Sequence, residues 1–226
     1  YGVGRDWPIG YETLEPFYQL AEERMGVSGA PADGLAPRSA DYPMGPMPLS
    51  YMERTIAETL NAHGYMMQTE PVARNNRTYD GRPPCCGNNN CMPICPIGAQ
   101  YSGNIAVERA QANGAQVITE AVAHFIERGS DGQIEAVRYL KPDGSEWRGR
   151  ARMFVLAANG IETPRLMLLS AQDGAPDGIG NRSDQVGRNL MDHPGTTVEF
   201  EMPEPVWPGR GPQEGTSILK FRDGDH

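Results

Sequence analysis

The sequence of 226 residues lacks the features that mark several common protein classes. It has no run of 18 apolar residues, so no segment is expected to cross a membrane as a helix. It has no complete Gly-x-Gly-x-x-Gly fingerprint, Walker loop, nucleophile elbow or His-Glu-x-x-His motif. Basic residues are few, 20 against 29 acidic ones, and the net charge of −9 argues against non-specific nucleic-acid binding. There is no initiator Met and no visible signal peptide, so we expect an internal piece of a longer chain.

What remains is the composition of a soluble globular protein, 38% hydrophobic and 22% charged. The length suits one large domain or two small ones. Glycine and proline are abundant, with 27 and 20 residues, which predicts many turns and long irregular connections. Helices are predicted over residues 13–25, with Thr13 as N-cap, over 52–63, and after Ser102.

The middle of the chain is predicted to be rich in strands. Alternating patterns and turn signals place them at 117–127, 133–140 and 146–149. Residues 151–157 are predicted to be a strand, and their continuous apolar run 153–157 predicts that it is buried on both faces. It leads through Asn159-Gly160 into a helix beginning near Thr163, an order typical of the closing half of a dinucleotide-binding sheet.

All four cysteines lie within eleven residues, in a stretch (71–103) that has neither helical nor strand periodicity. Long loops of this kind are commonly functional. An iron–sulfur cluster, a zinc ion and two disulfides are the three sites compatible with the spacing, and the Cys-x3-Cys-Pro ending favours the cluster. The adjacent Cys85 and Cys86 are poorly placed to ligate one cluster together, so Cys85, Cys91 and Cys95 form the more natural ligand set.

Five segments together resemble the glucose–methanol–choline (GMC) oxidoreductases. Residues 156–170 resemble the second signature of the family, and residues 186–194 match another of its familiar segments. Segments 5–9, 87–99 and 207–213 are similar to the flavoprotein subunits of bacterial membrane-associated gluconate, glucose, fructose and sorbitol dehydrogenases. The resemblance covers essentially the whole chain. His193 lies in the segment 186–194; on its residue type alone it is better explained as a hydrogen-bonded turn residue.

The resemblance implies bound FAD and a 3Fe-4S cluster held by Cys85, Cys91 and Cys95, with Cys86 a non-ligand. It also implies periplasmic export with a small chaperone-like subunit, and a multi-haem cytochrome c subunit that accepts electrons and anchors the complex to the membrane. The residues that it places near the cofactor are Ala121, Val122, Ala158, Asn159, Gly160, Thr163, Asn189, Asp192 and His193.

The expected fold class is mixed α/β: the central part of a GMC-type Rossmann-like FAD domain with a β-meander, part of the substrate domain, and the long cysteine loop. The expected divisions are residues 1–70 (helical and irregular), 71–103 (cysteine loop), 104–195 (FAD domain) and 196–226 (start of the substrate domain). The family's glycine-rich βαβ unit is expected before Tyr1, and its catalytic histidine after His226, so no catalytic residue is assigned in this chain.

The function predicted from the resemblance is FAD-dependent oxidation of a CH–OH group of a sugar, sugar acid or polyol, with electrons leaving through the cluster to the cytochrome. These markers do not fix the substrate. The alternatives are a GMC-type flavin oxidase with a structural cysteine loop, and a non-enzymatic metal-binding module.

Overall fold

The computed structural model describes residues 6–31, 37–207, 209, 211–212, 215–218 and 220. Arg5, Pro208, Arg210 and Gln213 of the family-like segments lie outside them. The chain divides into two compact units, one of residues 1–113 with 200–226, the other of residues 114–199. Within the described residues no helix is long and apolar enough to span a membrane. The predicted divisions at 70, 103 and 195 concern the domains of a whole flavoprotein and stay a prediction.

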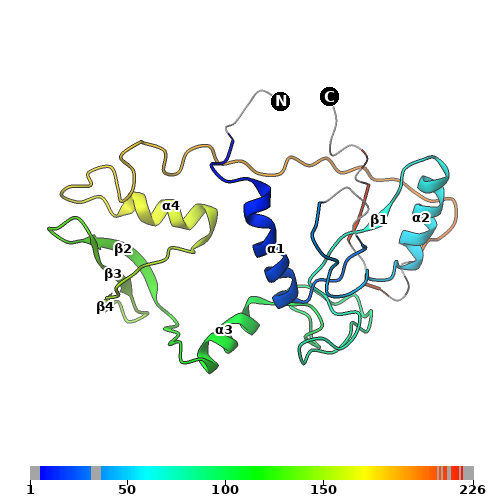
Figure 1. Cartoon of the computed structure of the whole chain (residues 1–226), viewed down its shortest axis with the longest axis horizontal. Coiled ribbons are helices and arrows are strands. Elements are labelled where there is room, and N and C mark those ends of the chain that lie inside the picture. The colour runs from blue at the N-terminus through cyan, green and yellow to red at the C-terminus, as the bar shows by residue number, and fades with distance from the viewer. Residues whose placement is uncertain are drawn as a thin grey trace. The chain divides into compact units, whose positions relative to one another are not determined.

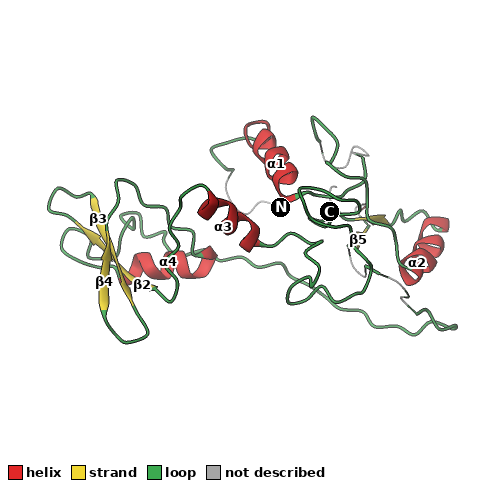
Figure 2. Cartoon of the chain, turned by 90° about the horizontal axis from the view of Figure 1, so that it is seen from below, coloured by secondary structure: helices red, strands yellow, loops and turns green. Residues whose placement is uncertain are grey.

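The first unit has little regular structure, as Figures 1 and 2 show. Its described helices and strands are α1 (Tyr11–Met25), α2 (Tyr51–Ala62), α3 (Gly103–Ala112) and the short antiparallel pair β1 (Gln68–Thr69) and β5 (Thr216–Ser217). Long irregular segments fill the space between them, in keeping with the glycine and proline content.

Helix α1 begins earlier than predicted, with Gly10 rather than Thr13 at the N-cap. It ends at Gly26, whose φ of 72° is left-handed and whose N–H donates to the Glu22 carbonyl over 2.9 Å. A Cβ at Gly26 would lie 2.8 Å from both Arg82 Nη2 and Tyr79 Cδ1. Glycine is therefore needed here for the turn and for the approach of the chain that precedes the cysteines.

Helix α2 confirms the prediction of a helix over 52–63, and it begins with a capping box. The Glu53 N–H donates to Ser50 Oγ over 3.3 Å, while the Ser50 N–H donates to Glu53 Oε2 over 2.7 Å. Helix α3 follows Ser102 as predicted, although the Ser102 side chain makes no capping hydrogen bond.

The second unit is built on an antiparallel meander of β2 (Val122–Arg128), β3 (Ile134–Leu140) and β4 (Glu146–Gly149), in that spatial order. These strands and the turns between them confirm the predicted mixed α/β chain with a β-meander. Residues 117–121, predicted as part of the first strand, lie outside it.

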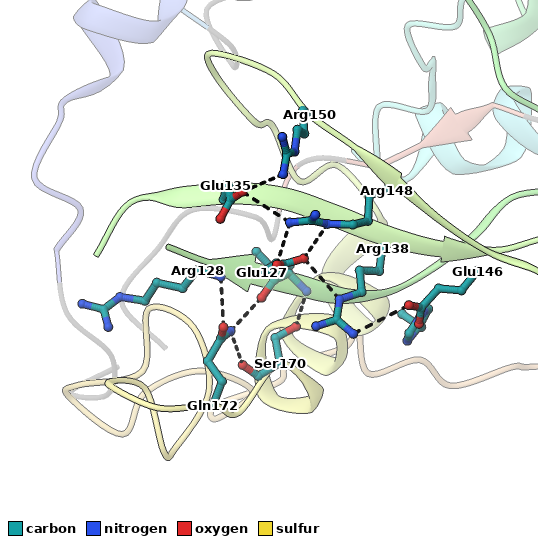
Figure 3. Close-up of polar contacts among 11 residues, drawn as sticks. Glu127, Arg128, Glu135, Arg138, Glu146, Arg148, Arg150, Ser170 and Gln172 are labelled. Carbon is teal, nitrogen blue, oxygen red and sulfur yellow. Dashed lines mark hydrogen bonds and ion pairs between the residues drawn. The ribbon is translucent and has the colours of Figure 1, made fainter. Parts of the chain in front are cut away.

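Helix α4 (Asn159–Leu169) packs against β2, and Ile126 on β2, Ala136 on β3 and Leu166 on α4 are buried. Figure 3 shows how the end of the helix bonds to the strand backbone. The Ile126 N–H donates to Ser170 Oγ over 2.8 Å. Gln172 accepts from the Arg128 N–H over 3.0 Å and donates to the Ile126 carbonyl over 2.8 Å. The edge of β2 that does not pair with β3 is thus satisfied by side chains.

The meander also carries a ladder of ion pairs across its three strands (Figure 3). Glu127 on β2 pairs with Arg138 on β3 and Arg148 on β4, with nitrogen–oxygen distances of 3.2 and 2.7 Å. Glu135 pairs with Arg150 over 2.8 Å. Opposite charges on neighbouring strands stabilise the register modestly.

The predicted buried strand at 151–157 is wrong for this structure. The segment is irregular, and Met153 and Val155 are 81% and 80% exposed. A strand buried on both faces needs hydrogen-bonded neighbours and covering layers. None of the described strands pairs with residues 151–157, and within the apolar run only Phe154 and Leu156 are half-buried.

Candidate functional site

The cysteine loop is closed at its base by backbone hydrogen bonds. The Asn75 N–H donates to the Ala99 carbonyl over 2.9 Å, and the Tyr101 N–H donates to the Ala73 carbonyl over 2.7 Å. Asn75 is fully buried, and its side-chain amide donates to the carbonyls of Tyr79 and Arg82 over 3.1 and 3.0 Å. The chain before the first cysteine is therefore folded around one amide side chain, and residues 73–75 and 99–101 lie together.

The four cysteines have different environments. All are free thiols, so the disulfide alternative finds no support. Cys91 is buried, Cys85 and Cys95 are half-buried, and Cys86 is exposed. Cys85 is anchored at both ends, because its N–H donates to the Asn75 carbonyl over 2.8 Å and its sulfur accepts from the Gly87 N–H over 3.3 Å. The prediction that Cys86 is a non-ligand stays a prediction.

Backbone amides favour a thiolate at Cys95. Partial burial acts to raise the pKa of the Cys95 thiol, but the backbone N–H groups of residues 97–100, led by that of Gln100, outweigh it and lower this pKa. Gly98 turns the chain there with a φ of 69°. Converging N–H groups of this kind form the concave anion sites found around metal-bound sulfur.

The structure does not gather the three predicted thiolates at one point. Among the described residues, no group of three or more His, Cys, Asp or Glu side chains is arranged to hold a metal ion. What fits a cluster is the chemistry of the donor set, namely free thiols with N–H groups directed at Cys85 and Cys95. The ligand set of Cys85, Cys91 and Cys95 stays a prediction.

A cavity of about 330 Å³ opens beside Cys95. Its walls include Arg82, Gln100 and Ser102. Arg74, almost fully buried, donates from Nη2 to Gln100 Oε1 over 3.0 Å. The sequence reasoning missed both arginines; the only available signal was the placement of Arg82 in the turn Gly81-Arg82-Pro83-Pro84, directly before Cys85.

In the second unit, the two signature segments meet around a cavity of about 650 Å³. Gly160 at the start of α4 and Asn189 in the following loop both line it, as do Arg165 and Arg188. The remaining wall is mainly apolar: Ile161, Pro164, Leu168, Leu169, Leu190 and Met191. Apolar surface beside two guanidinium groups suits a nucleotide, which has flat rings and phosphates.

The residues at the start of α4 have well-defined local roles. Asn159, with a left-handed φ of 66°, accepts the N–H groups of Ile161 and Glu162 at its Oδ1 over 2.8 and 3.0 Å. The Ala158 N–H donates to Thr163 Oγ1 over 3.1 Å. These contacts shape the turn into the helix, and binding of FAD by Ala158, Asn159 and Thr163 stays a prediction.

The other predicted cofactor residues are not brought to this cavity. Ala121 immediately precedes β2, and the exposed Val122 pairs with Leu140 at the end of the sheet. The side chains of Asp192 and His193 are fully exposed and contact chiefly each other, with the His193 N–H donating to Asp192 Oδ1 over 2.7 Å. Their predicted role in binding FAD is untested.

Known proteins resemble this chain over both the cysteine loop and the segments that line the larger cavity. The GMC oxidoreductase family model matches residues 7–195. The fructose dehydrogenase large subunit of Gluconobacter japonicus is 50% identical over 100% of this chain and 42% of its own length. The 6'''-hydroxyparomomycin C oxidase of Streptomyces lividus is 34% identical over 84% of this chain and 35% of its own. The gluconate 2-dehydrogenase flavoprotein of Pantoea cypripedii is 25% identical over 82% of this chain and 34% of its own length.

The chain thus spans less than half the length of these relatives. The family match nevertheless includes the cysteine loop, the meander and both segments that line the larger cavity. These findings establish that the chain belongs to the GMC oxidoreductase family.

Proposed function

We propose that this chain forms part of an FAD-dependent dehydrogenase that oxidises a CH–OH group of a sugar, sugar acid or polyol, with fructose as the first candidate substrate. The observation that carries the proposal is the 50% identity to a fructose dehydrogenase large subunit along the entire chain. When bound, FAD supplies the acceptor for the two electrons and hydrogen that leave the substrate carbon. Gly160, Asn189 and the neighbouring guanidinium groups would hold it.

The proposed electron route uses the cysteine loop. Cys85, Cys91 and Cys95 would hold a 3Fe-4S cluster, which supplies one-electron transfer when bound. Free thiols on a closed loop and amides at Cys95 support this assignment. A multi-haem cytochrome c subunit would receive the electrons, a small chaperone-like subunit would accompany the flavoprotein, and the complex would lie at the periplasmic face of the membrane.

The test of the activity uses the full-length protein that contains this chain, purified with its associated subunits. Fructose, gluconate, glucose and sorbitol are supplied in turn with an artificial one-electron dye. We expect at least one of them to bleach the flavin absorption and reduce the dye, with fructose fastest. If none bleaches the flavin, the proposed substrate class is wrong.

The test of the electron route compares two cysteine variants of the same enzyme. Cys91→Ser should abolish electron transfer to the cytochrome while FAD stays bound and is still reduced by sugar. Cys86→Ser, the control, should retain transfer. Iron and acid-labile sulfide in the purified protein, with an EPR signal of the oxidised cluster, are the direct readouts. A zinc-containing product without iron would overturn the assignment.

A flavin oxidase is the second candidate, because an oxidase is 34% identical to this chain. It predicts sugar-dependent consumption of oxygen at rates comparable to dye reduction, unaffected by Cys91→Ser. Family membership argues against a non-enzymatic metal-binding module.

A further inference from the structure

Asn181 is a buried asparagine in the loop that joins α4 to the segment 186–194. It is 5% exposed, and both polar atoms of its side chain form hydrogen bonds. Nδ2 donates to the Asp177 carbonyl over 2.9 Å, and Oδ1 accepts from the Val186 N–H over 3.0 Å. The Asn181 carbonyl also accepts from the Asp184 N–H over 3.0 Å. One residue therefore closes the loop of residues 177–186.

The closed loop lies directly on the last turn of α4. The Ile179 N–H donates to the Met167 carbonyl over 2.9 Å. A Cβ at Gly178 would lie 2.7 Å from the Met167 oxygen and 2.9 Å from Leu168 Cα, and the φ of 98° at this position also favours glycine. Because the backbone of the loop contacts the backbone of the helix, the loop has little freedom to shift while it stays closed.

Asn181 is connected to the larger cavity in two ways. Along the chain, Val186 is followed directly by Gly187, with which the cavity-lining stretch 187–191 begins. Through side chains, Arg188 in the cavity wall donates from Nε to the Asp184 carbonyl over 2.6 Å, and its Nη2 pairs with the Asp184 carboxylate. Asp184 is in turn held by the Asn181 carbonyl. The places of both Gly187 and the Arg188 guanidinium thus depend on Asn181.

We infer that Asn181 is a positioning residue of this cavity: its amide holds residues 187–189 against α4 in the arrangement to which FAD binds, and so raises the affinity for FAD. The inference rests on the proposed function. Asn181 is not one of the described residues that line the cavity, so it acts through the loop. A cavity wall that is already ordered loses less conformational entropy when the ligand binds, which makes binding tighter.

The test measures FAD binding by the full-length enzyme after removal of its bound flavin. The dissociation constant is obtained from the quenching of flavin fluorescence, at a temperature where every variant is folded. Asn181→Ala should weaken FAD binding at least tenfold. In the protein without FAD, hydrogen exchange at the Val186 amide should accelerate, because that N–H loses its acceptor. Exchange at the Ile126 amide in β2 should stay unchanged.

Two controls separate positioning from stability. Ser170 is also fully buried, but its hydroxyl joins α4 to β2 and it does not line the cavity (Figure 3). Ser170→Ala should therefore lower the unfolding temperature and keep the FAD dissociation constant within twofold. Gln185→Ala removes an exposed amide from the loop itself and should change neither quantity. A merely structural role of Asn181 predicts instead that Asn181→Ala behaves like Ser170→Ala.

Each outcome decides the inference. A folded Asn181→Ala enzyme with unchanged FAD affinity overturns it and leaves the proposed function intact. A wild-type enzyme that binds no FAD overturns the proposed function, and this inference with it.

If Asn181→Ala does not fold, Asn181→Asp decides instead. It keeps the acceptor for the Val186 N–H and loses the donation to the Asp177 carbonyl. Its FAD binding must be at least fivefold weaker than that of the wild type, and the difference must shrink at low pH, where a protonated carboxyl can donate again. Gln185→Glu, which adds the same charge to the same loop, should stay within twofold. Equal effects of the two acidic variants would overturn the inference.

Discussion

The two units of the chain reach stability by different means. In the meander unit, repeating backbone pairs fix three strands, and side chains of α4 complete the edge of β2. In the cysteine-loop unit, long irregular segments depend on individual buried polar groups, chiefly Asn75 and Arg82. Strand pairing spreads the stabilisation over many equivalent bonds, whereas an irregular loop concentrates it in a few. Changes to single polar residues should therefore lower the free energy of unfolding more in the cysteine-loop unit than in the meander unit.

The largest effect is expected at Asn75. Asn75→Ala removes both amide donations, although the carbonyls of Tyr79 and Arg82 still accept each other's backbone N–H. We expect a loss of about 3 kcal/mol in the free energy of unfolding, roughly 1 for each lost hydrogen bond and the rest from the cavity that the fully buried side chain leaves. Chemical denaturation measures it. Asn76→Ala, which removes an exposed amide, should cost under about 1 kcal/mol. Equal losses for the two variants would contradict the contrast.

The corresponding change in the meander unit is Ser170→Ala. Ser170 is fully buried, accepts from the Ile126 N–H and donates to the Leu166 carbonyl over 2.7 Å. We expect a loss of about 1–2 kcal/mol, smaller than at Asn75 because the strand keeps its pairing with β3. Hydrogen exchange at the Ile126 amide should accelerate, while Ser130→Ala in the exposed turn should leave it unchanged. A Ser170→Ala loss larger than that of Asn75→Ala would reverse the comparison.

A regular element inside the irregular unit provides an intermediate case. Ser50→Ala breaks the capping box of α2 and should cost about 1 kcal/mol. Thr59→Ala, on an exposed turn of the same helix, should be neutral or slightly stabilising. The unfolding temperatures of the two variants distinguish the contribution of the N-terminal cap from that of helix propensity. No difference between them would show that the cap does not limit stability.

The smallest effect is the pH dependence of the ion-pair ladder. Desolvation acts to raise the pKa of Glu127, but hydrogen bonds and attraction from Arg138 and Arg148 outweigh it and lower this pKa. A carboxylate with a lowered folded-state pKa contributes stability above its unfolded value, about 4.3, that is lost as pH falls through the folded-state pKa. Denaturation midpoints between pH 6 and 3 should fall less steeply in Glu127→Gln than in the wild type. Parallel profiles would show that the ladder contributes nothing.

The helices and strands could largely be predicted from the sequence, whereas the buried polar residues that hold the irregular segments could not. Strand alternation and Gly-rich turns identified the meander, and helix periodicity identified α2. The prediction of a strand at 151–157 was wrong because an apolar run indicates only that its side chains favour burial. Whether the backbone pairs as a strand depends on neighbours distant in the chain. Arg82 and Asn75 escaped notice for a related reason, since the burial of a polar residue depends on contacts that local patterns do not encode. Cysteine spacing identified the loop, but the amide surroundings of Cys95 emerge only from its folded backbone.

The way in which Ser170 and Gln172 meet β2 also bears on aggregation. An unpaired strand edge offers a template to which another chain can add by backbone hydrogen bonding. Here a hydroxyl and a carboxamide occupy the donor and acceptor positions that an incoming strand would use. Intermolecular sheet growth should accordingly be resisted at β2.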